Sequence, residues 1–163
     1  GKSYSNSFQA QVNIEPVKKL DIRLAYRLFD VKATYSGQLA ERPLISKHRA
    51  FANLAYAIKG FKFDYTVSFN GKKRLPGTQA NIPVYKLPGY SPAFVTMNAQ
   101  ISKTFGQKYP FEIYIGAENL TNYFQKNVIL AADQPFGQYF DASMVWGPVS
   151  GRMYYTGLRL TIK

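Results

Sequence analysis

Three consecutive basic residues, Lys72, Lys73 and Arg74, form the densest cationic cluster of the sequence. The chain carries 21 Lys and Arg against 9 Asp and Glu, and its formal net charge of +12 favours an anionic partner or surface. Aromatic side chains that could stack on a bound molecule follow this cluster along the chain. The candidate substrate-binding residues are therefore Lys72, Lys73, Arg74, Tyr85, Tyr90, Tyr139 and Trp146.

Each candidate also has a simpler structural explanation. A basic cluster of this kind is more often a solvated loop tip or a contact with lipid phosphates than a site of substrate capture. Trp146, the only tryptophan, could stack on a substrate, although such a residue more often packs its loop against neighbouring segments. Nucleic-acid binding is disfavoured, because neither an RNP-like aromatic motif nor a recognition helix accompanies the charge.

Catalytic and metal chemistry find little support in the residue types. The sequence contains no cysteine and a single histidine, His48, which excludes thiolate sites and multi-histidine metal sites. We expect His48 to lie at a rim beside Arg49 and not to act as a ligand. The late carboxylates have no activated nucleophile or second base nearby in sequence; they are Glu112, Glu118, Asp133 and Asp141. The sequence predicts a protein that is not an enzyme and that has no catalytic residues, metal or cofactor.

The elements that would position these residues are β-strands. Residues 61–70, FKFDYTVSFN, alternate without interruption between apolar and polar side chains, which is typical of a strand with one face of each kind. No apolar run is long enough for a transmembrane helix. We predict an all-β antiparallel fold with seven strands, at 5–14, 20–29, 48–57, 61–70, 93–104, 111–119 and 151–163.

Short and long connections alternate between these strands. The short ones are 15–19, 58–60 and 105–110, and the long ones are Asp30–Lys47, Gly71–Pro92 and Leu120–Ser150. In an antiparallel meander this places all short turns at one end and all long loops at the other. Outer-membrane barrels have short periplasmic turns, long extracellular loops and strands of about ten residues. A soluble sandwich or lipocalin-like barrel is the alternative, since its strands alternate equally well.

Aromatic residues gather where the interfacial girdles of such a barrel should lie. Near the short turns are Tyr56, Phe61, Phe105, Tyr109 and Phe111; near the long loops are Tyr26, Phe69, Phe94, Tyr154 and Tyr155. The apolar face of residues 61–70 is therefore expected to meet lipid, and the polar face to meet a lumen.

Three stretches resemble TonB-dependent outer-membrane receptors, particularly those of Bacteroidetes. Residues 115–163 contain GAENLTNY, FDASMVWGP and YTGLRL in the order found at the end of those receptors. Residues 26–56 resemble a strand, a loop ending in "HR" and the next strand, and residues 90–106 (YSPAFVTMNAQISKTFG) resemble a later strand entry. The chain departs from the pattern by ending in Ile162-Lys163 where a terminal aromatic is usual.

The resemblance implies that residues 1–163 are the C-terminal part of a transmembrane barrel with 22 strands, the plug and the N-terminal strands being absent. A start at Gly1 without an initiator Met fits a processed or excised piece. The implied function is uptake of a ferric siderophore, haem, cobalamin or similar nutrient at the outer membrane, driven by TonB. Implied partners are the remaining barrel and plug, TonB, lipid and lipopolysaccharide, and a surface lipoprotein, with no nucleic acid. A small self-contained outer-membrane barrel and a soluble basic β-sandwich binding module remain alternatives.

Overall fold

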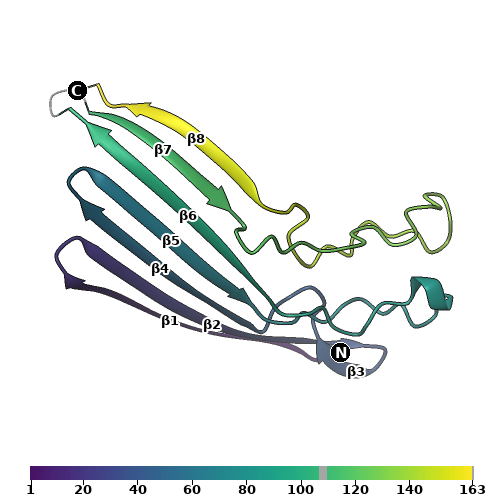
Figure 1. Cartoon of the computed structure of the whole chain (residues 1–163). Helices are drawn as coiled ribbons and strands as arrows, with labels where there is room; N and C mark the ends of the chain where they lie inside the picture. The colour runs from purple at the N-terminus through teal and green to yellow at the C-terminus, as the bar shows by residue number, and fades with distance from the viewer. Residues whose placement is uncertain (107–109, 163) are drawn as a thin grey trace.

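The computed structural model describes residues 1–106 and 110–162, and these form one antiparallel sheet with long links at one end (Figure 1). The sheet has eight strands in the order β1-β2-β4-β5-β6-β7-β8, with β3 paired to β2. Their bounds are β1 Ser3–Val17, β2 Leu20–Tyr35, β3 Gln38–Glu41, β4 His48–Ile58, β5 Phe61–Asn70, β6 Phe94–Phe105, β7 Phe111–Glu118 and β8 Met153–Leu160. The predicted all-β antiparallel fold is confirmed, whereas the predicted strand number of seven is wrong by one.

The turns between β1 and β2 and between β4 and β5 lie together at the end of the sheet opposite the long links (Figure 1), whereas residues 107–109 of the predicted turn 105–110 lie outside the described residues. Between β4 and β5 the turn is Lys59-Gly60, with φ of 46° and 81°, and Ile58 pairs with Phe61 across it. Two central residues with positive φ match the twist of a hairpin, and glycine adopts the second at no steric cost. The predicted separation of short turns from long links is thus confirmed for the described residues. Tyr109 and Lys163, included in the predicted girdle and last strand, lie outside those residues.

The first long link is not a plain loop, contrary to the sequence prediction. Strand β2 continues to Tyr35, turns at Ser36-Gly37 with φ of 49° and 81°, and returns as β3. The apolar alternation ends at Leu28, because Asp30 and Lys32 follow on the same face of the strand. From Phe29 to Tyr35 the alternation continues with its phase inverted, because the apolar residues now lie on the other face; the series that defined the predicted strand therefore stops at Leu28.

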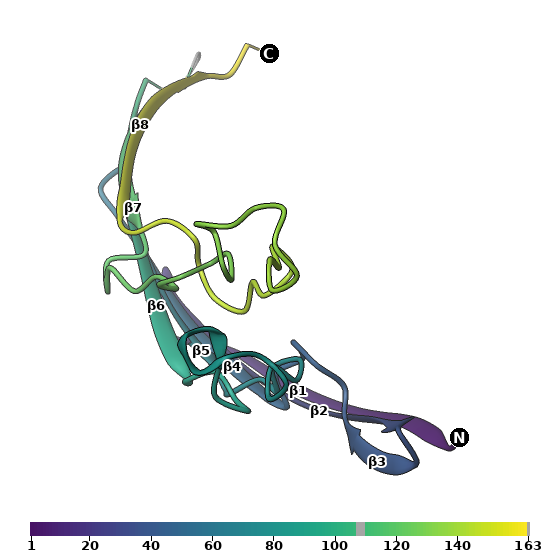
Figure 2. The ribbon, with the colours of Figure 1, turned by 90° about the vertical axis from the view of Figure 1, so that its right-hand side faces the viewer.

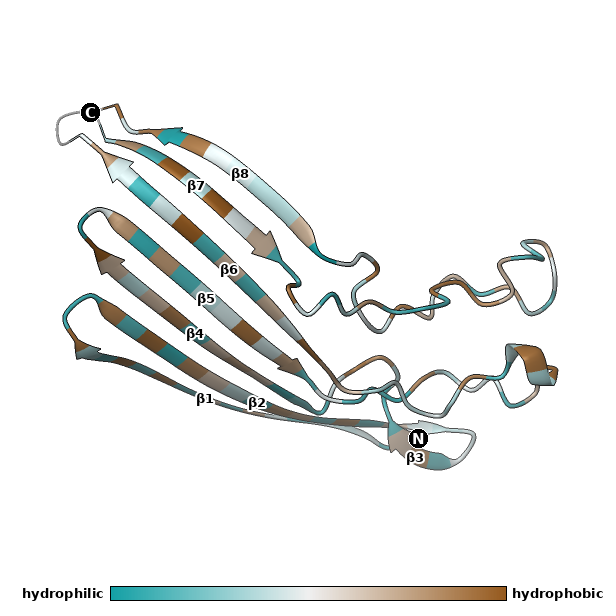
Figure 3. Cartoon of the chain, in the orientation of Figure 1, coloured by the Kyte–Doolittle hydropathy of each residue, from teal (hydrophilic) through white to brown (hydrophobic). Residues whose placement is uncertain are grey.

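Register confirms the two predicted faces of the sheet. Leu24 pairs with Ala52, Ala52 with Val67 and Val67 with Met97, which aligns one apolar row across four strands. The adjacent row is polar and consists of Arg23, Asn53, Thr66 and Asn98. Figure 3 shows the resulting alternation of hydrophobic and hydrophilic residues along the strands.

The apolar face is uncovered. Leu54 is 43% exposed and Ile115 is 61% exposed, and exposed aromatic rings lie beside them on the same face. The buried apolar residues of the described chain are Leu75, Phe94, Ala117, Leu130, Ala131 and Met144, of which only Phe94 and Ala117 belong to strands. A contiguous exposed apolar face of this kind marks a surface that interacts with another protein surface or with a membrane.

Lys103 lies on the apolar face close to the short-turn end of the sheet, where it pairs with Phe61. Its Nζ atom lies 4.0 Å from the Phe61 ring centroid and donates a hydrogen bond to the Lys59 carbonyl at 2.7 Å. The aliphatic stem therefore follows the apolar surface while the charged group reaches the polar turn, the behaviour typical of lysine at a boundary.

The sheet is curved, and the last long link, residues 119–152, lies on its concave side (Figure 2). Phe94 pairs with Asn70, so its side chain lies on the polar face of the sheet. Its ring stacks on Tyr123 of the last long link, with centroids 4.9 Å apart, so the polar face is on the same side as that link. The polar face is thus the concave one. The predicted girdle positions of Phe94 and Tyr155 are wrong, since Tyr155 also lies on the polar face and donates to Gln100 Oε1 at 3.0 Å.

Candidate functional site

The basic cluster follows β5 directly and ties the first two long links together. Arg74 pairs with Tyr90 in an antiparallel bridge and accepts a hydrogen bond from the Leu44 amide at 2.8 Å. Its guanidinium donates to the Glu41 carbonyl at 2.8 Å and lies 5.1 Å from the Tyr35 ring centroid. Arg74 therefore holds the β2–β3 hairpin against the second long link.

Lys72 and Lys73 point to different surroundings. Lys72 is exposed, and its Nζ lies 4.6 Å from the ring centroid of Tyr90. Lys73 is half-buried, and its Nζ donates a hydrogen bond to the carbonyl of Trp146 on the last long link. Burial lowers the pKa of Lys73, and the positive charge of Arg49 lowers it further. Lys73 is therefore the cation of the cluster that faces the concave side.

Three aromatic residues pack above the loop end of the concave face, and we call them the aromatic cluster: Phe94, Tyr123 and Trp146. The Phe94 and Tyr123 rings are nearly parallel, at 6°, and Trp146 lies 6.2 Å from one and 6.3 Å from the other, centroid to centroid. Burial raises the pKa of the Tyr123 hydroxyl. The aromatic cluster therefore fastens the root of the last link to the sheet.

Gln125 supports this cluster from within the link. Its side chain is 3% exposed; Nε2 donates to the Met144 carbonyl at 2.7 Å, and Oε1 accepts from the amides of Trp146 and Gly147 at 2.8 and 3.1 Å. The hydrogen bonds of the Gln125 side-chain amide therefore all go to residues 144–147, the segment of the same link that returns to the sheet. Trp146 has the packing role that the simpler explanation predicts, and stacking on a substrate stays a prediction.

The second and third long links also meet at their far ends. The Tyr85 hydroxyl donates to the Asp133 carboxylate, 2.9 Å from Oδ2, and the Tyr85 and Tyr139 ring centroids are 5.7 Å apart. The hydrogen bond to Asp133 raises the pKa of Tyr85, with burial adding to it. Phe136, fully exposed, and Val84, 75% exposed, lie in the same two links. The two links are thus connected at their far ends, and each carries an exposed apolar side chain there.

The predicted binding residues do not converge on one centre. The structure brings together Lys72 with Tyr90, Lys73 with Trp146, and Tyr85 with Tyr139, while Arg74 contacts Tyr35. The first and second contacts lie at the loop roots, the third joins the loop tips, and the fourth joins the second link to the tip of the β2–β3 hairpin. Direct contact of any of these side chains with a substrate stays a prediction.

Three of the four late carboxylates have separate partners. Glu112 accepts from Arg159 at 3.0 Å, Asp133 accepts from Tyr85, and Asp141 accepts from the Ser143 hydroxyl at 2.6 Å. Within residues 1–106 and 110–162, no group of three His, Cys, Asp or Glu side chains is arranged to hold a metal ion. His48 lies at the start of β4, where its Nδ1 is 2.7 Å from the Tyr26 hydroxyl.

Several residues that shape the site were not among the predicted binding residues. Phe94 leaves a signal, because it is an aromatic side chain at a polar-face position of its strand. Gln125 leaves none, since its contacts are made with residues about twenty positions later in an irregular link. Arg27 and Arg49 also escape a search along the chain, because only the strand register makes them neighbours.

In the part of the chain that the structure describes, no helix is long and apolar enough to cross a membrane. No protein-family model matches the chain, and no curated protein matches it. Among solved structures, the siderophore receptor PiuA from Acinetobacter baumannii matches 96% of this chain and 21% of that chain, with a TM-score of 0.59 and 18% sequence identity. This chain therefore spans about a fifth of the length of that receptor. The likeness is one of fold: the open antiparallel sheet matches part of the barrel of a TonB-dependent receptor, as the sequence resemblance predicts.

Proposed function

We propose that this chain forms part of the barrel wall of an outer-membrane receptor that binds a scarce nutrient and imports it with energy supplied through TonB. One observation carries the proposal: a curved sheet exposes an apolar convex face and turns a polar face toward the long links. A lipid bilayer on one side and a lumen on the other satisfy both faces.

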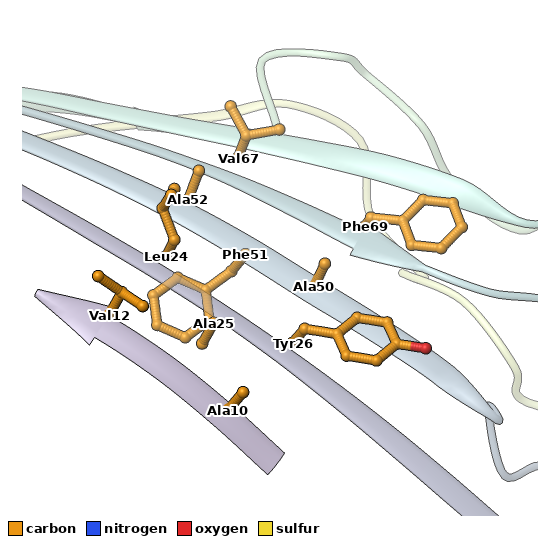
Figure 4. Close-up of a pocket in the computed structure, with 10 residues that line it drawn as sticks. All are labelled: Ala10, Val12, Leu24, Ala25, Tyr26, Ala50, Phe51, Ala52, Val67 and Phe69. Carbon is orange, nitrogen blue, oxygen red and sulfur yellow. The ribbon is translucent and has the colours of Figure 1, made fainter. Parts of the chain in front are cut away.

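The lipid-facing assignment explains a hollow on the apolar face. Figure 4 shows the small Ala50 between the larger Tyr26 and Phe69, and the small Ala52 between Leu24 and Val67. The hollow measures about 440 Å³ and its lining is almost wholly apolar. Most of its walls belong to the convex face, so we assign it to contact with lipid chains and not to capture of the nutrient.

In this assignment the short turns face the periplasm and the long links face outward. The links then supply the residues that capture the nutrient, with Lys72, Lys73, Arg74, Tyr85, Tyr90, Tyr139 and Trp146 as proposed contacts. We favour a ferric siderophore over haem or cobalamin, because the matched solved structure is a siderophore receptor. The further strands needed to reach 22, the plug and the TonB-engaging segment would belong to the same receptor, and lipopolysaccharide and a surface lipoprotein are proposed outer partners.

The two alternatives fit the structure less well. A soluble β-sandwich needs a second layer over its apolar face, and within residues 1–106 and 110–162 no second sheet is present. A self-contained barrel needs its first and last strands paired, whereas β1 pairs only with β2 and β8 only with β7 among the described strands. Unpaired strand edges in hydrocarbon are costly, so further strands are required to close the wall.

The structure offers a clean way to test capture by the last long link. Leu130 and Asp141 exchange two backbone hydrogen bonds, at 2.9 and 3.1 Å, so residues 131–140 can be replaced by Asn-Gly across that pair. The exchange removes Asp133 and Tyr139 and leaves Gln125 with its partners. We expect growth on a ferric siderophore as the only iron source to fall, while surface labelling of the full receptor stays normal.

The matched control replaces Lys59-Gly60 by Asn-Gly at the opposite end of the sheet, and this receptor should support normal growth. Unchanged growth after shortening all three long links would place capture in other parts of the receptor.

A further inference from the structure

A hollow of about 240 Å³ lies on the polar, concave face where the strands meet the roots of the first two long links. Three of its lining side chains are cations from separate elements: Arg27 of β2, Arg49 of β4 and Lys73 of the second link. We call it the cationic hollow. Its remaining lining residues are Phe29, Leu44, Ile45, Ser46 and Asn70, so it contains no carboxylate.

Arg27 and Arg49 are direct partners in the β2–β4 register. Like charges at directly opposite positions repel each other and destabilise a sheet unless something between them carries the opposite charge. In the part of the chain that the structure describes, neither guanidinium forms a salt bridge. Arg27 instead lies 5.2 Å from the Phe29 ring centroid. The pair is therefore a concentration of positive charge on the concave face that no carboxylate of residues 1–106 and 110–162 pairs with.

Carboxylates of the same sheet region lie far along the strands or on the other face. Asp21 precedes Arg27 by six positions on the polar face, and Asp64 pairs with Ala55, six positions after Arg49. Six residues of a strand correspond to about 20 Å. Asp30 is closer in sequence, but it belongs to the apolar-face series and lies 3.5 Å from the Lys47 ammonium.

Lys73 is the third cation of the cationic hollow. One of its three N–H bonds goes to the Trp146 carbonyl, which leaves two for a ligand. Its lowered pKa has burial and Arg49 as causes, and no carboxylate contributes, in agreement with the absence of an acidic group beside it. Three like charges gathered at one hollow create a positive potential that attracts an oppositely charged solute.

We propose that Arg27, Arg49 and Lys73 bind an anionic solute that carries several clustered oxygen atoms, such as carboxylate, phosphate or catecholate groups. The inference rests on the proposed function, because the hollow lies beneath the links that would capture the nutrient. It names a class of substrate: the imported complex is anionic, with one oxygen-rich arm seated between the two guanidinium groups. Guanidinium forks match paired oxygens in geometry, which makes arginine the suitable residue here.

Citrate tests the site without any requirement for iron or transport. Calorimetric titration of the full-length receptor in detergent should detect citrate binding that weakens as salt is added, because the contact is between charges. The R27Q/R49Q double variant should bind citrate about tenfold more weakly or worse.

The matched control is Arg23→Gln. Arg23 lies on the same face of the same strand, four positions earlier, and its Nε already donates to Asn13 Oδ1 at 3.1 Å. We expect this variant to bind citrate as the unaltered receptor does. Removing Arg27 and Arg49 also removes a repulsion, so the thermal unfolding temperature of the double variant should stay level or rise.

Two outcomes overturn the inference. If the unaltered receptor and the double variant bind citrate equally, or if neither binds it, the cationic hollow is not an anion site. If the unaltered receptor does not bind citrate and the double variant unfolds at a lower temperature, Arg27 and Arg49 instead form salt bridges with a carboxylate elsewhere in the receptor. Failure of the proposed function has a different signature: citrate binding would persist, but no ferric chelate would support growth through the receptor.

Discussion

Tyr155 lies against Gly116 on the neighbouring strand, so closely that a methyl group at Gly116 would overlap the tyrosine ring. The same relationship occurs with the strands exchanged two pairs further along, where the ring of Tyr114 on β7 occupies the space beside Gly157 on β8. The two rings are 6.3 Å apart, centroid to centroid, and Tyr155 reaches across to Gln100 of β6. Two glycines thus let two tyrosines lie flat on the concave face and link three strands.

This arrangement predicts a cost for Gly116→Ala. The added methyl group displaces the Tyr155 ring and breaks its hydrogen bond with Gln100, so the free energy of unfolding should fall by about 1–3 kcal/mol. Denaturant unfolding of the full receptor in lipid measures the change. Gly77→Ala is the control, since nothing lies within 4 Å of a Cβ atom there. Equal stability of the two variants would contradict the packing role of Gly116.

The assignment of faces predicts different costs for two neighbouring substitutions in β5. Val67 lies in the apolar row between Ala52 and Met97, whereas Ser68 lies on the polar face between Phe51 and Thr96. Val67→Arg should destabilise the receptor in lipid by roughly 2–4 kcal/mol near the bilayer midplane, and Ser68→Arg by much less. Folding titrations in lipid vesicles decide between them, and equal losses would rule out lipid on the convex face.

Gln125→Ala should loosen the last long link without unfolding the sheet. The substitution leaves the Met144 carbonyl and the Trp146 and Gly147 amides without their partner, and each buried group left unpaired costs about 1–3 kcal/mol. We expect faster proteolysis within residues 119–152 and the same unfolding midpoint for the barrel. Gln138→Ala, at an exposed position of the same link, provides the control and should leave proteolysis unchanged.

Residues 1–163 expressed alone should aggregate in plain buffer. The uncovered apolar face and the free edges of β1 and β8 both favour association between copies. Analytical ultracentrifugation after refolding is the direct measurement. A soluble monomer with a cooperative unfolding transition would contradict the membrane assignment, while recovery only in detergent or denaturant agrees with it.

The strands that cross the apolar band were predictable, because there one face differs in chemistry from the other. Phe61–Asn70 has the predicted bounds, fixed by the Lys59-Gly60 turn and by its unbroken alternation. The continuation of β2 beyond Leu28 was missed, because the apolar residues change faces there: Asp30 and Lys32 follow Leu28 on one face, while Phe29 and Val31 lie on the other. Sequence patterns thus describe a strand better where one face stays apolar throughout than where the apolar residues change faces.

The candidate site was less accessible to prediction, because its contacts depend on register and on irregular links. Lys73 was singled out by the cluster that contains it, but its neighbour Arg49 lies more than twenty positions earlier and reaches it only through the fold. Phe94 and Tyr155 were assigned to girdles by their position near the loops. Because successive side chains of a strand point to opposite faces, both residues lie on the polar face. Counting positions from the apolar residues of each strand would have predicted this.

The Leu130–Asp141 bridge has a consequence for the entropy of closing the sheet. Bringing β7 and β8 together across residues 119–152 costs about 2–3 kcal/mol more than a two-residue turn, because closure entropy grows with the logarithm of loop length. The bridge, together with the bonds of Gln125, divides that long closure into shorter ones that form locally. Residues between the bridged pair can then be lengthened or exchanged with almost no further loss of chain entropy, so the outermost segment is free to vary while β8 keeps its register.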